Sequence, residues 1–242
     1  MSRLRPTGLS LALLLVFATS VGLAQAPTPK AKPVTPKPID DEPKILTAEE
    51  SAKRRRSSFS DGDDRYGSNE PWSEVPPWKQ TSFFGLRARA QTIVFVVDCS
   101  ESMADEDRLV RAKRELRRSV MAMQFPQRFL VIFYNEAPLP MPGATLKSAD
   151  MASKDGLAAW LRLIEPDGGT DPRAAMRMAI GFKPDAIYLL SDGLFPDGTA
   201  EDIAAKNLAK IPIHCIDLTA GAAGDHLKRI ARESGGKYAP RN

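Results

Sequence analysis

Runs of β-branched and aromatic apolar residues recur along the chain from residue 92 onward, separated by longer amphipathic segments. Each run is short and almost continuously apolar, which is typical of a strand buried on both faces in a parallel sheet. A proline-bearing stretch at 137–146 indicates a turn or a ragged edge strand. The predicted strands span 92–98, 129–134, 185–190 and 212–218, and a short edge strand is expected at 237–239.

The segments between these runs have helical spacing. Leu109, Ala112 and Leu116, for example, fall on one helical face. Strands that alternate with helices predict an α/β fold of the Rossmann-like, doubly wound type, with a mostly parallel sheet and helices on both faces. Residues 80–90 are expected to form an extended lead-in to the first long strand. The predicted helices span 106–123, 154–164, 173–182 and 199–209, and a last helix begins at Asp225.

The first 24 residues have the pattern of a targeting signal. Arg3 and Arg5 precede an apolar run over 9–24, and small residues suited to cleavage end that run. We therefore expect a signal peptide at 1–24 and an exported protein, located in the periplasm, at the cell envelope or in the medium. An uncleaved N-terminal anchor is the alternative, because residues 7–29 carry no charge and just reach the length that spans a bilayer. Membrane contact is expected only through that segment.

Residues 25–81 are rich in proline, lysine and charged side chains. This composition favours extended chain and provides too little apolar surface for a core, so it predicts a disordered linker. The basic run Lys53–Arg56 is either a contact for an anionic surface or a solvated part of this linker. The folded domain is expected to span 82–242.

Overall composition excludes several classes of protein. The net charge of +4 is spread over the 242 residues rather than concentrated, so we expect no nucleic-acid partner. Cys99 and Cys215 are the only two cysteines of the sequence, which excludes a disulfide-stapled fold, and both are expected to be buried free thiols. We also expect a monomer.

Polar side chains with oxygen donors follow two of the predicted strands and occupy one predicted loop. In a parallel sheet such residues meet at the carboxyl ends of the strands, where ligands bind. Carboxylates and hydroxyls without imidazole or thiolate suit a hard divalent cation such as Mg²⁺. The candidate metal ligands are Asp98, Ser100, Ser102, Thr170 and Asp192.

This ordered set resembles the metal-ion-dependent adhesion site of the von Willebrand factor type A domain family, in particular of its exported bacterial members. The resemblance covers residues 82 to the C-terminus. It implies that Ser100 and Ser102 bind Mg²⁺ directly, that Asp98 holds the ion largely through water, and that Thr170 and Asp192 bind directly or through water. Mn²⁺ and Ca²⁺ are alternative ions. A partner protein's Asp or Glu carboxylate would complete the metal shell.

One residue departs from the family pattern. Glu101 stands where many relatives have glycine, so its side chain either faces solvent or competes for the open metal position and modulates partner binding. We expect a binding module and no enzyme, since the sequence has no G-x-S-x-G, P-loop or H-E-x-x-H motif. A metal-independent envelope scaffold and a metal-dependent hydrolase remain as alternatives.

Overall fold

A computed structural model describes residues 71–193, 195–219 and 224–241. Its larger sheet has seven strands in the order β5-β4-β3-β7-β8-β9, with β6 pairing β4. The strands are β1 (Gln80–Phe83), β2 (Leu86–Arg89), β3 (Thr92–Asp98), β4 (Arg128–Tyr134), β5 (Pro138–Pro140), β6 (Lys147–Ser148), β7 (Ala186–Ser191), β8 (Ile213–Asp217) and β9 (Tyr238–Pro240). The α-helices are α2 (Arg108–Ala122), α3 (Met151–Trp160), α4 (Arg173–Gly181), α5 (Thr199–Lys206) and α6 (Gly224–Ser234). Short 3₁₀ helices are η1 (Trp72–Glu74), η2 (Pro77–Lys79), η3 (Glu101–Asp107) and η4 (Leu161–Leu163).

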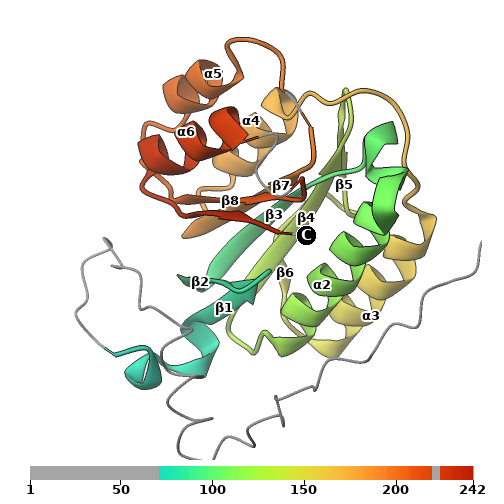
Figure 1. Cartoon of the computed structure of the whole chain (residues 1–242). Coiled ribbons are helices and arrows are strands. Elements are labelled where there is room, and N and C mark those ends of the chain that lie inside the picture. Colours follow the sequence, from blue (N-terminus) through green and yellow to red (C-terminus); the bar gives the residue numbers. More distant parts are fainter. Residues whose placement is uncertain (1–70, 194, 220–223, 242) are drawn as a thin grey trace, which may run out of the picture. The chain divides into compact units, whose positions relative to one another are not determined.

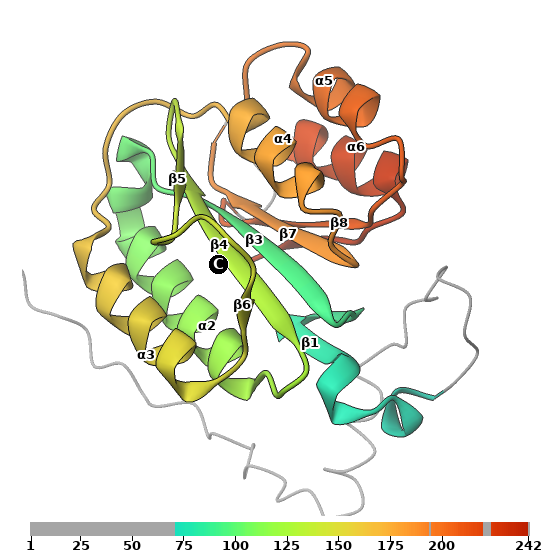
Figure 2. The ribbon, with the colours of Figure 1, turned by 180° about the vertical axis from the view of Figure 1, so that it is seen from behind.

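The predicted fold class is confirmed. Strands β4, β3, β7, β8 and β9 run parallel to one another, while β5 and β6 add short antiparallel edges to β4. Helices α2 and α3 cover one face of the sheet, and α4, α5 and α6 cover the other (Figure 1). The reverse view shows the same division (Figure 2). The apolar runs that predicted the strands are therefore buried on both sides, as in doubly wound folds.

The connections of β3 create the position at which a ligand can bind. The chain leaves β3 for β4 on one side and later returns to β7 on the other side of β3. Such a reversal of strand order opens a crevice at the carboxyl ends of the strands. The loops after Asp98 and Ser191 both begin at this edge, because each residue ends its strand.

The segment expected to be an extended lead-in is instead a hairpin. β1 and β2 pair antiparallel, and the two turn residues Phe84 and Gly85 both have positive φ. This combination fits the two-residue turn that matches the twist of paired strands. Phe83 from the hairpin is fully buried, with its ring 5.2 Å from Phe95 and 5.5 Å from Tyr188. The hairpin thus closes one end of the hydrophobic core.

Two helices begin at residues other than those predicted. α2 starts at Arg108 rather than 106, because Glu106 and Asp107 have left-handed backbone conformations that interrupt the helical path. α3 starts at Met151 rather than 154, because the Asp150 side chain accepts a hydrogen bond from Ser153 N and caps the helix.

The N-terminal expectations fall largely outside the described residues. The signal segment at 1–24 lies there, as does the linker up to residue 70. The first element among the described residues begins at Trp72, upstream of the predicted boundary at residue 82, and Val75 is buried. Among the described residues, no helix combines the length and apolar character needed to cross a bilayer.

Candidate metal centre

Asp98 anchors the site at the point where three strands end. It is the last residue of β3 and is fully buried. Its Oδ1 accepts a hydrogen bond from Ser100 N at 2.8 Å, and its Oδ2 accepts from Ser191 Oγ at 2.7 Å and Tyr134 Oη at 3.2 Å. Burial raises the pKa of Asp98 above its ordinary value, and the hydrogen bonds from Ser191 and Ser100 oppose that rise. These hydrogen bonds thus fix the position of the carboxylate. A nearby cation would stabilise its buried negative charge.

Three oxygen donors lie beside Asp98 in a continuous chain of contacts. Ser100 Oγ is 3.2 Å from Ser102 Oγ, and Ser102 Oγ donates to Asp192 Oδ1 at 2.9 Å. Mg²⁺ binds oxygens at about 2.0–2.1 Å in an octahedron, which places neighbouring oxygens about 2.9 Å apart. The observed separations are hydrogen-bond distances, and they bring three oxygens close enough to become adjacent ligands of one small cation, whose preference for oxygen the donor set fits.

Thr170 comes to the same edge on a separate loop. The backbone N–H of Glu101 donates to the carbonyl of Gly168 at 3.0 Å, which ties this loop to the one that follows β3. Thr170 lies against Gly193, where an added Cβ would meet Thr170 Cγ2 at 3.3 Å and Oγ1 at 3.4 Å. Glycine at 193 therefore leaves room for Thr170 next to the Asp192 loop.

The structure thus places all five predicted ligands at the carboxyl edge of β3 and β7, with Asp98 at the end of β3 and Ser102 in η3. Glu101 lies on the same edge with an exposed side chain. Among the described residues, no group of three or more His, Cys, Asp or Glu side chains is arranged to hold a metal. Any ion at this edge would accordingly rely on hydroxyl oxygens for much of its shell.

Sequence reasoning missed three residues at the site, of which Arg108 contacts a candidate ligand with its charge. Arg108, the first residue of α2, donates from Nη1 to Asp192 Oδ2 at 2.9 Å and from Nη2 to Glu106 Oε2 at 3.1 Å. The hydrogen bond to Asp192 raises the pKa of Arg108, so the guanidinium stays protonated. No motif marked Arg108, because it is one of several arginines in a strongly basic helix and its contact depends on the turn before it. Ser191 and Tyr134 were also missed as partners of Asp98, although a polar residue at the end of a buried strand is a usable signal.

The family to which this chain belongs follows from comparison with known proteins. The family model of the von Willebrand factor type A domain matches residues 91–239 of the sequence, which is more than half of the chain. This chain is a member of the von Willebrand factor type A (VWA) domain family. No curated protein matches the chain.

Two solved structures support the VWA fold. One is a von Willebrand factor type A protein from Catenulispora acidiphila, with 18% identity and a TM-score of 0.56; the match covers 65% of this chain and 40% of that one. The other is an aerotolerance-related membrane protein from Bacteroides fragilis, with 19% identity and a TM-score of 0.51, covering 62% of this chain and 91% of that one. This chain thus spans two fifths of the Catenulispora protein, and at such identities the likeness establishes the fold alone.

Proposed function

We propose that the VWA domain of this chain is a binding module that holds Mg²⁺ with Asp98, Ser100, Ser102, Thr170 and Asp192. The observation that carries the proposal is the convergence of Ser100 Oγ, Ser102 Oγ and Asp192 Oδ1, which contact one another at 3.2 and 2.9 Å at the carboxyl edge of the sheet. When bound, the ion would supply a coordination position for an external oxygen. Mn²⁺ and Ca²⁺ are weaker candidates for the same donors.

The partner in this proposal is a protein that presents an Asp or Glu side chain. Two carboxylates, Asp98 and Asp192, balance the two charges of the ion, and hydroxyls supply the other protein ligands. A site with so little direct anionic coordination favours a third carboxylate from outside. Glu101 is exposed beside the site, where its carboxylate would repel or replace that of a partner. The family supports this interpretation, because VWA domains are in general adhesion and binding modules.

Export is part of the same proposal. It rests on residues 1–24, whose charged start, apolar run and small residues are typical of a signal peptide. The protein would then act in the periplasm, at the cell envelope or in the medium.

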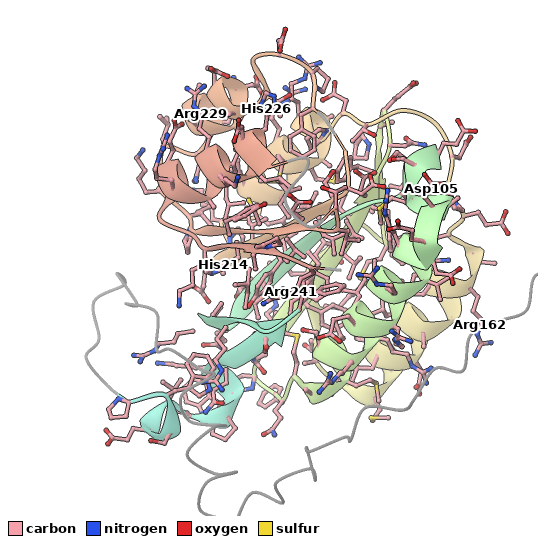
Figure 3. The ribbon with its side chains drawn as sticks, in the orientation of Figure 1. Asp105, Arg162, His214, His226, Arg229 and Arg241 are labelled. Atoms are coloured by element: carbon pink, nitrogen blue, oxygen red, sulfur yellow. The ribbon has the colours of Figure 1, made fainter. Side chains whose placement is uncertain are left out.

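A binding role fits the site better than an enzymatic one. Asp98 accepts three hydrogen bonds and Asp192 accepts two, so each carboxylate is already engaged. His214 accepts a hydrogen bond from Lys237 N, and its ring lies 5.2 Å from that of Tyr188. Figure 3 shows His214 well separated from Asp105, which lies in η3 directly after the site loop. General-base catalysis requires a base within hydrogen-bond reach of the reacting atoms.

Metal binding is tested by titrating the purified protein with Mg²⁺ and Mn²⁺ in a calorimeter. We expect saturable binding at one site, lost in Asp192→Asn. The matched control is Asp197→Asn, since Asp197 is an exposed carboxylate in the same connection between β7 and α5. Absence of binding by the wild type at millimolar metal would refute the proposal, as would equal loss in both variants.

Partner capture is tested separately. Immobilised protein would be exposed to envelope and secreted proteins in Mg²⁺ or in a chelator, and retained proteins identified by mass spectrometry. We expect a partner that is retained by the wild type and Asp197→Asn in Mg²⁺, and that is lost in the chelator and in Asp192→Asn. If the same proteins are retained in Mg²⁺, in the chelator and by Asp192→Asn, capture through the metal is contradicted.

A further inference from the structure

Arg108 already supplies a positive charge to the carboxylate that the proposed ion would use. Its guanidinium contacts Asp192 Oδ2 at 2.9 Å, while the other oxygen of Asp192 faces Ser102 Oγ. The Asp192 side chain is 0% exposed and that of Arg108 is 15% exposed, so water screens this ion pair weakly. The pair therefore differs from the exposed ion pairs on the other helices of the domain.

The backbone before α2 is shaped to bring Arg108 to this position. Glu106 and Asp107 have φ values of 50° and 55°, a left-handed conformation that non-glycine residues rarely adopt. These two residues end η3 and form a kink before α2, and the first side chain of the helix, Arg108, then reaches Asp192. Glu106 also accepts from Arg108 Nη2 at 3.1 Å, which fixes the guanidinium from its other side.

The arrangement matters because two cations share one carboxylate. A divalent ion bound to Ser100, Ser102 and Asp192 Oδ1 would lie within a few ångströms of the Arg108 guanidinium. Like charges at such a distance in a poorly solvated site repel each other strongly. Arg108 also withdraws charge from Asp192, and the carboxylate is a weaker metal ligand as a result.

We infer that Arg108 is an internal counter-cation that lowers the affinity of the site for its divalent ion and keeps Asp192 neutralised until the ion arrives. The inference rests on the proposed function, since it assigns a regulating residue to the same metal site. Arg108 thereby sets the metal concentration at which the domain becomes competent to bind its partner. The alternative is that Arg108 orients Asp192 as a ligand, and that alternative predicts the opposite change in affinity.

The two interpretations are separated by metal titration of Arg108→Gln, Arg108→Lys and Arg114→Gln. Arg108→Gln is expected to bind Mg²⁺ at least about tenfold more tightly than the wild type, equivalent to about 1.4 kcal/mol. Arg108→Lys keeps the charge and is expected to stay close to the wild type. Arg114→Gln makes the same change of net charge at an exposed position of α2 and is expected to leave affinity unchanged.

Thermal unfolding gives a second readout that does not depend on partner binding. In a chelator, Arg108→Gln is expected to unfold at a lower temperature than the wild type, because Asp192 is left buried without its cation. Added Mg²⁺ should then raise its melting temperature more than that of the wild type.

Each outcome decides a specific point. Weaker Mg²⁺ binding by Arg108→Gln, or equal gains in Arg108→Gln and Arg114→Gln, would overturn the inference and leave the metal site standing. Absence of binding by the wild type and by every variant would overturn the proposed function and this inference with it.

Discussion

Single residues at the carboxyl edge of the sheet are governed by the cost of burying charge. Asp98 is fully enclosed and receives three hydrogen bonds, yet no cationic side chain is paired with it in the described part of the chain. Asp192 is equally enclosed but is paired with Arg108. Burying an ionised carboxylate is costly unless it is paired or bound to a metal. Removal of the negative charge is therefore expected to affect stability differently at Asp98 and at Asp192.

Replacement of Asp98 by asparagine should separate stability from metal binding. The amide would keep the shape of the side chain, and its oxygen can accept from Ser100 N. Its NH2 group would face the Ser191 and Tyr134 hydroxyls, which can turn to accept, while the buried charge disappears. We expect chemical denaturation to show that the metal-free Asp98→Asn protein is no less stable than the wild type. Its free energy of unfolding could be higher by about 1–3 kcal/mol. Mg²⁺ should no longer bind, as calorimetry would show. A large loss of stability in the chelator would mean that the Asp98 charge supports the fold without metal.

The two cysteines should be chemically inert in the folded protein. Both are buried free thiols, as the sequence predicted, and burial raises the pKa of Cys99 to about 12. The thiolate is the reactive form, and it is scarcely populated below that pKa. At pH 8 we expect neither thiol to react with a disulfide reagent until denaturant is added, after which two equivalents react. Rapid reaction of one thiol in the native protein would contradict this expectation.

Residue types explain which parts of the site could be predicted. Asp98, Ser100, Ser102 and Asp192 could be proposed as ligands because oxygen-bearing residues at strand ends stand out against apolar runs, and Thr170 because it lies in a glycine-bearing loop before a helix. Arg108 could not be found in this way, since its contact depends on left-handed residues at 106 and 107 that no apolar pattern encodes. Acidic residues before a helix normally indicate a favourable helix start. Here Glu106 and Asp107 instead form the left-handed kink that precedes α2.

At the scale of elements, the hairpin β1–β2 contributes a large aromatic side chain to the core. Its Phe83 is fully buried and meets Phe95 and Tyr188 in edge-to-face contacts. Phe83→Ala would leave a cavity in a closely packed core, so we expect a loss of about 3–5 kcal/mol in the free energy of unfolding. Urea denaturation followed by circular dichroism would measure it.

The control for this prediction is Leu208→Ala. Leu208 is 85% exposed and lies after α5, so the same truncation to alanine should change stability by less than about 0.5 kcal/mol. A comparable loss in both variants, or a negligible loss in Phe83→Ala, would mean that the hairpin is dispensable for the core.

Elements with strong periodicity were predicted well, and those set by local capping or turns were not. The four long strands were predicted because burial on both faces leaves a continuous apolar run. The hairpin was missed because each of its strands has only four residues and its turn is Phe-Gly, without the usual Asn or Asp signal. The start of α3 was missed because Asp150 caps it before the apolar positions begin.

At the scale of the whole molecule, the proposed metal binding would be linked to folding. The candidate ligands come from three loops that follow β3, precede α4 and follow β7, so the site exists only when the sheet is assembled. An ion that binds the folded state alone stabilises it by mass action. The domain should therefore be more stable in magnesium than in a chelator, and the gain should depend on the ion concentration.

This linkage can be measured by thermal unfolding. At a Mg²⁺ concentration of about 100 times the Kd, the folded state gains about 2.7 kcal/mol, which corresponds to a rise of about 5–10 °C in the melting temperature for a domain of this size. Asp192→Asn should show no rise, because one carboxylate of the site loses its charge, whereas Asp197→Asn should follow the wild type. A rise of equal size in Asp192→Asn would show that the ion acts elsewhere on the molecule, and the site at the carboxyl edge of β3 would lose its thermodynamic support.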